Sequence, residues 1–85
     1  MRVKVTAAAA TTIVSGPATV HLQNKTATAA VFLEIVPEGG KATEASGYEW
    51  GATAGVLGLV LHSEQTLSGI VKAAGAEQEL HVLHS

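Results

Sequence analysis

The chain has 85 residues, with five Lys or Arg, seven Asp or Glu, a net charge of −2 and no cysteine. This length supports one domain with one core, and folding hides only about 60% of the surface that the unfolded chain exposes. The five cations are scattered, which argues against nucleic acid as a partner, and the lack of cysteine excludes disulfides and cysteine-based zinc sites.

The first predicted element is a strand at Arg2–Thr6, where polar and apolar residues alternate and Val3 and Val5 face inward. Residues 7–17 are predicted to be an extended connector that ends in a turn. Four alanines lie in this connector, but they are too few to nucleate a helix. Residues 1–17 are therefore expected to be the N-terminal strand and connector of a single domain that spans residues 1–85.

Two strands are predicted in the middle of the chain, at Ala18–Gln23 and Thr28–Val36, and in the first of them Val20 and Leu22 face inward. The second strand is apolar on both faces. Such a strand is either central and covered on both sides, or has one face reserved for a partner. The residues Pro37–Gly40 that follow it are a strong turn signal.

Short strands continue through the C-terminal half of the chain. A short element at Gly47–Gly51 is followed by predicted strands at Val56–His62, Thr66–Ala73 and Gln78–His84, with polar or Gly-containing turns between them. This spacing predicts an all-β fold, a single small antiparallel β-sandwich or barrel-like domain of about seven or eight short strands.

Neither a secretion signal nor a membrane span is expected. Polar alternation follows Met1–Lys4, where a signal peptide would have an apolar run. The longest apolar run, Val56–Leu61, is interrupted by Gly58 and is far too short to cross a bilayer. We expect a soluble protein without a membrane partner, and the lack of cysteine fits synthesis in a reducing cytoplasm.

The polar residues do not form a recognisable catalytic or metal-binding pattern. His81 and His84 point to opposite faces of a strand because their spacing is odd, whereas His21 and His62 could approach each other across strands. There is no aspartate, and no serine lies in a Gly-x-Ser-x-Gly elbow. We therefore expect no enzyme activity, no catalytic residue, no metal site and no cofactor.

The three aromatic residues and the first strand are the candidates for partner binding. Tyr48 and Trp50 share one face of a strand and could form a sugar-stacking or protein-docking patch. The favoured interpretation is that Trp50 plugs one end of the sandwich with Tyr48 packed beside it. Phe32, on the second face of its strand, is a candidate interface anchor, and the first strand could add to a neighbour's sheet. The candidates are Arg2, Val3, Lys4, Val5, Phe32, Tyr48 and Trp50.

From Ala18 onward, a strand ending in Gln23-Asn24 precedes an apolar strand, the element Gly47-Tyr48-Glu49-Trp50 and a final hairpin from Leu67 to Leu83. This order of elements resembles that of the small β-sandwich virion proteins of tailed bacteriophages. Typical members have Gly-Tyr-Pro-Leu where this chain has Glu49 and Trp50. The segment Gly55–His62 is also more apolar than its usual counterpart, which suggests a docked surface.

This resemblance implies a capsid decoration protein with no catalytic residue. Such a protein binds the outside of the assembled head where major capsid subunits meet, and it reinforces the shell. The implied partner is the major capsid protein, with a possible homo-oligomer, a dimer or trimer, on the shell. The implied location is the capsid surface of the virion. The alternative function is a carbohydrate- or receptor-binding module of a phage tail or fibre, which predicts an exposed Trp50.

Overall fold

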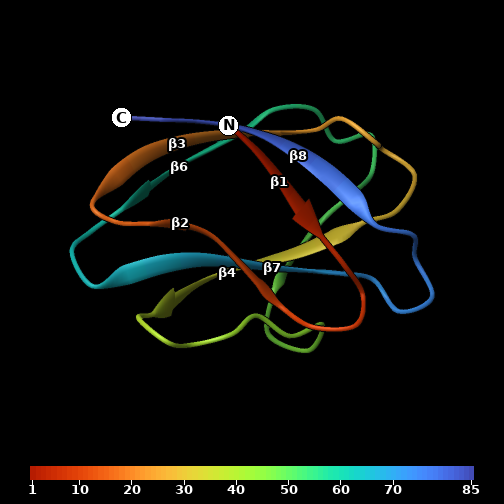
Figure 1. The fold of residues 1–85 in the computed structure, drawn as a ribbon, viewed down its shortest axis with the longest axis horizontal. Helices are drawn as coiled ribbons and strands as arrows, with labels where there is room; N and C mark the ends of the chain where they lie inside the picture. The colour runs from red at the N-terminus through yellow and green to blue at the C-terminus, as the bar shows by residue number, and fades with distance from the viewer.

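The computed structural model describes all 85 residues, which form eight strands and no helix. Figure 1 shows the strands arranged in two layers. The strands are β1 (Arg2–Val5), β2 (Thr11–Ser15), β3 (Ala18–Asn24), β4 (Val31–Pro37), β5 (Tyr48–Trp50), β6 (Leu57–Leu61), β7 (Gln65–Val71) and β8 (Gln78–His84). Since the chain has no helix, it has none long and apolar enough to cross a membrane.

The strands form two four-stranded antiparallel sheets that pack face to face. The first sheet has the order β1-β8-β3-β6 and the second has the order β2-β7-β4-β5. The predicted all-β sandwich is therefore confirmed. The chain changes sheet at almost every connection, and only β4 and β5 are consecutive strands that pair with each other.

Two details of the predicted strand arrangement are wrong. The expected final hairpin does not form, because β7 and β8 lie in different sheets. Part of the predicted connector is also a strand, because residues 11–15 form β2 and pair with β7. Alternation of polar and apolar residues is satisfied equally by a hairpin and by a chain that crosses between sheets. The alternation therefore did not reveal either feature.

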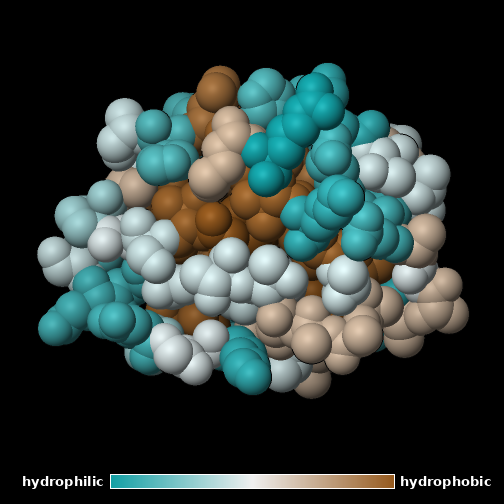
Figure 2. Space-filling view, viewed as in Figure 1, coloured by the Kyte–Doolittle hydropathy of each residue, from teal (hydrophilic) through white to brown (hydrophobic).

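The core consists of aliphatic side chains from the inner faces of both sheets. In β3, Val20 and Leu22 point inward as predicted and retain at most 1% exposure. In β8, Leu80 and Val82 do the same. The buried cluster comprises Val5, Ile13, Val14, Ala18, Val20, Leu22, Val31, Leu33, Trp50, Leu61, Leu67, Val71, Leu80 and Val82. Figure 2 views the molecule with β1 and β2 toward the reader, and apolar side chains gather in its middle, between hydrophilic ones.

The outer face of the second sheet is covered by the chain's own residues 38–47. Phe32 and Val36 lie on this face and are 7% and 5% exposed. The backbone N–H of Ala42 donates to Ser68 Oγ on the same face, at 3.0 Å. A side chain at Gly47 would meet Phe32 Cβ at 2.9 Å, so only glycine lets the segment pass this close. The apolar second face of β4 is therefore covered from within the chain.

Gln78 joins the loop after β3 to the start of β8. Its side chain is fully buried. Its Oε1 accepts hydrogen bonds from Asn24 Nδ2 and from the backbone N–H groups of Thr28 and Ala29, at 3.0–3.2 Å. Its Nε2 donates to Thr28 Oγ1, Ala76 O and Glu77 O, at 2.8–3.2 Å. One buried amide thus links the loop after β3 to the loop before β8.

Candidate binding groove

The largest surface opening is an apolar groove between the two sheets, with a volume of about 510 Å³. It lies on the side of the sandwich where β5 and β6 are the edge strands. Its lining residues are Leu33, Glu34, Ile35, Ser46, Tyr48, Leu57, Leu59 and Leu67. We call these residues the apolar groove. Six of the eight are hydrophobic, which is typical of a site that binds apolar groups.

The groove is open because β5 is much shorter than its neighbour. β5 has three residues and pairs only with residues 31–33 of β4. The rest of β4 has no partner strand on that side, so inward-facing Ile35 stays 43% exposed. Tyr48 pairs with Leu33 at the end of this short ladder and is 61% exposed. Apolar side chains that point toward the core are thus left in contact with water.

One rim of the groove is polar. Ser46 Oγ donates to Glu34 Oε1 at 2.6 Å. The Ser46 hydroxyl also lies 2.7 Å from Thr43 Oγ1, and its backbone N–H donates to the same oxygen at 3.1 Å. These contacts fix the turn before β5 and hold the Glu34 carboxylate beside the apolar lining. The rim therefore offers an acceptor next to an apolar surface.

The opposite wall of the groove is β6, an edge strand without charge. No Asp, Glu, Lys or Arg occurs between Glu49 and Glu64. Leu57 and Leu59 face the groove and are half-buried, whereas Val56 and Val60 are 66% and 55% exposed. Most edge strands carry charges or proline that prevent pairing with other chains. This edge has neither.

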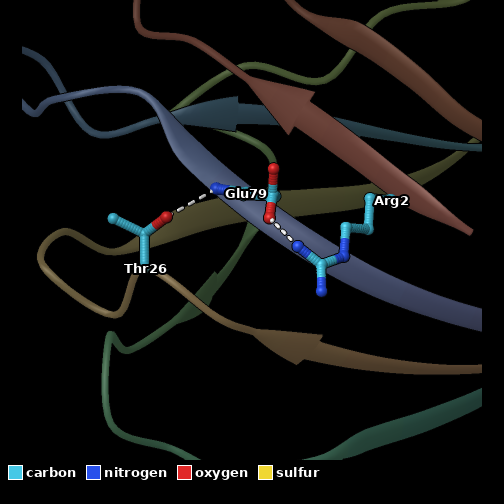
Figure 3. Close-up of polar contacts among 3 residues, drawn as sticks. All are labelled: Arg2, Thr26 and Glu79. Atoms are coloured by element: carbon cyan, nitrogen blue, oxygen red, sulfur yellow. Dashed lines mark hydrogen bonds and ion pairs between the residues drawn. The ribbon is translucent and has the colours of Figure 1, made fainter.

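The predicted contact strand β1 is engaged within the molecule. It pairs with β8, and Val5 is fully buried in the core. Arg2 donates to Glu79 Oε1 at 3.0 Å, and the backbone N–H of Glu79 donates to Thr26 Oγ1 at 2.8 Å, as Figure 3 shows. Val3 is half-buried and Lys4 is exposed. Only the outer edge of β1 stays unpaired, since β1 is the first strand of its sheet.

The aromatic candidates differ in accessibility. Trp50 is 2% exposed, and its Nε1 donates to Gly55 O at 3.2 Å, so the predicted burial of Trp50 is confirmed. Phe32, the candidate interface anchor, is 7% exposed, because residues 38–47 cover its face of the sheet. Tyr48 was expected to pack beside Trp50, but it lies at the mouth of the groove. Of the three aromatic residues, Tyr48 alone is exposed.

Trp50 is the single tryptophan, so its fluorescence tests this placement directly. We expect a blue-shifted emission in the native protein that moves to longer wavelength on unfolding, because a buried indole is shielded from water. Acrylamide is expected to quench native Trp50 much less than Trp50 in urea. Adding glycans is expected to leave the emission unchanged. A native emission at the wavelength of free tryptophan would contradict the burial.

His21 lines one small pocket with His81 and another with His84, whereas His62 lines neither. His21 pairs with Gly58 and Leu83, whereas His62 lies beyond the end of β6, so the two do not meet across strands. His81 pairs with Gln23 and Arg2 on the outer face of the first sheet. No three metal-ligating side chains are grouped closely enough to hold an ion.

The sequence pattern marked part of the groove and missed the rest. The unusual apolarity of residues 55–62 was visible, and β6 lies within this segment. Ile35 and Leu33 looked like ordinary core positions. Their exposure depends on the length of β5, and the local sequence pattern did not predict that length.

Comparison with known proteins found no protein family, no curated protein and no solved structure that matches the chain.

Proposed function

We propose that the protein is a decoration protein of a bacteriophage head, which binds the outside of the assembled shell where major capsid subunits meet. It acts by binding, without a catalytic step, and its location is the capsid surface. The observation that carries the binding role is the apolar groove with its exposed Ile35 and Tyr48. The choice of partner rests on the resemblance of residues 18–85 to phage virion proteins.

The energetic role follows from covering the groove. Apolar surface that a capsid side chain removes from water contributes about 25 cal/mol per Å². A protein that binds the assembled shell and not its free subunits stabilises the shell by mass action. Many copies each add a modest contribution of this kind. The groove is expected to receive an apolar capsid side chain, with a hydrogen-bond donor placed near Glu34.

Binding to phage heads tests the proposal. Heads should be purified from the phage or prophage whose genome encodes this chain, in a form that lacks the protein. We expect the purified wild-type protein to co-sediment with these heads and to raise the temperature at which they release DNA. A replacement Tyr48→Lys is expected to abolish co-sedimentation, since it places a charge at the mouth of the groove.

Leu83→Lys is the matched control for Tyr48→Lys. Leu83 is also 61% exposed, but it lies on the outer face of the first sheet, away from the groove. We expect this variant to bind heads like the wild type. Failure of the wild-type protein to bind both procapsids and mature heads would overturn the proposal. Equal binding by Tyr48→Lys and wild type would show that the groove is not the contact.

The alternative, a carbohydrate- or receptor-binding module, loses its main structural support. It requires an exposed Trp50 as a stacking platform. Trp50 is instead buried and hydrogen-bonded to Gly55. Tyr48 is the one exposed aromatic residue that remains to stack on a sugar.

A further inference from the structure

We propose that two copies of this chain pair through their β6 edges, in antiparallel register about a two-fold axis at Gly58, and so form a continuous eight-stranded sheet. β6 is the last strand of the sheet β1-β8-β3-β6, so one of its edges has no partner. The pairing concerns the protein alone. It is therefore tested without any phage particle.

The backbone groups that such a partner needs are free. Thr19 exchanges both backbone hydrogen bonds with Ser85, on the β8 side of β3. Backbone groups of successive residues alternate in direction, so the N–H and C=O groups of Val20 point toward β6, where Val20 pairs with Leu59. The N–H and C=O groups of Leu59 are therefore directed toward β3. The N–H and C=O groups of Gly58 and Val60 point to the open edge.

The sequence of the edge is symmetric. Residues 56–60 read Val-Leu-Gly-Leu-Val, a palindrome centred on Gly58. In antiparallel register about Gly58, Val56 meets the second copy's valine 60, and Leu57 meets its leucine 59. Gly58 lies beside the two-fold axis and faces glycine 58 of the second copy. The backbone groups of Gly58 and Val60 point to the open edge, and those of Val56 do so once β6 is extended by one residue, so every pair that must exchange hydrogen bonds can then do so.

The side chains at the β6 edge also favour a second copy of the chain as the partner. Val56 and Val60 are among the most exposed large hydrophobic residues, and this register pairs them with each other twice. Cross-strand pairs of β-branched residues stabilise antiparallel sheets. Because no charge lies between Glu49 and Glu64, two identical edges meet without like-charge repulsion. A second copy thus satisfies both the polar and the apolar requirements of the edge.

The pairing also extends the apolar groove. Leu57 and Leu59 form one wall of the groove and lie on the face opposite to Val56 and Val60. In the paired sheet these leucines lie next to those of the second copy. The two grooves then share a wall of four leucines across the axis.

The test is the mass of the purified protein in solution, measured by sedimentation equilibrium or by light scattering after gel filtration. We expect a dimer for the wild type. Val60→Lys is expected to be monomeric at concentrations where the wild type is dimeric, since two lysines would face the apolar edge. Leu83→Lys adds the same charge to an exposed residue of β8, which β3 separates from β6, and should stay dimeric. A monomeric wild type, or a dimeric Val60→Lys, would overturn the proposal.

A cysteine at the axis tests the register. In Gly58→Cys the two sulfurs would lie across the axis, and facing residues of an antiparallel pair are close enough for a disulfide. A Cβ there would lie 3.3 Å from His21 Cδ2, the end of an exposed side chain that can move. We expect rapid covalent dimers on mild oxidation, and slow ones for Leu83→Cys as the control. Equal rates for the two variants would contradict the register.

Discussion

Replacing Gln78 with alanine is expected to lower the free energy of unfolding by about 3–5 kcal/mol. Each hydrogen bond contributes about 0.5–1.5 kcal/mol net, and a buried polar group left without a partner costs about 1–3 kcal/mol. The substitution removes six hydrogen bonds of the Gln78 amide, one of which comes from buried Asn24. A native domain has only about 5–15 kcal/mol in total, so this loss is large. The measurement is urea unfolding followed by the fluorescence of Trp50.

Gln65→Ala is the matched control for Gln78→Ala. Gln65 also binds the backbone through its amide, since its Oε1 accepts from His62 N at 2.8 Å. Its side chain is only half-buried, so water can replace the lost bond. We expect a loss of about 1 kcal/mol for this control. Similar losses in the two variants would mean that the buried amide does not join the two loops.

Gly16→Ala is expected to destabilise the protein by about 2–3 kcal/mol, because overpacking costs this much where the neighbours cannot move. Gly16 lies in the connection from β2 to β3, where the chain passes from one sheet to the other. A side chain there would collide with His62 O and would meet Leu61 Cβ at 2.9 Å and Gln65 O at 3.2 Å. His62 O belongs to the connection from β6 to β7, and Gln65 O belongs to the backbone of the first residue of β7. The two crossings therefore pack against each other without room for a methyl group.

Gly51→Ala is the control for Gly16→Ala. A side chain at Gly51 would meet nothing within 4 Å, and its φ lies outside the left-handed region. We expect a change near zero or a gain of about 0.5 kcal/mol, since alanine restricts the unfolded chain. The comparison uses the urea midpoints of the two variants. Equal midpoints would rule out the close approach at Gly16.

The two proposed contacts use different sides of the same strand. The hydrogen-bonding edge of β6 is assigned to a second copy, and the face that carries Leu57 and Leu59 is assigned to the capsid. Val60→Lys and Tyr48→Lys separate these roles. The first is expected to remove the dimer, and the second is expected to remove head binding while the dimer persists.

The sequence alone determined most of the strands and several of their inner faces. In β3 and β8 the alternation of period two put Val20, Leu22, Leu80 and Val82 inside, because successive side chains of a strand point to opposite faces. Turn residues such as those at Pro37–Gly40 bounded the strands for equally local reasons. These features depend on neighbouring residues only.

Strand partners, and therefore the groove, were decided by the tertiary structure. Alternation is the same whether β7 and β8 form a hairpin or lie in different sheets, and it could not show that residues 11–15 pair with β7. The apolar second face of β4 left two possibilities open. Residues 38–47 cover Phe32, whereas short β5 leaves Ile35 and Tyr48 exposed on the other face. Contacts between residues far apart in the chain decide which apolar surface remains for a partner, and a pattern read along the chain does not contain them.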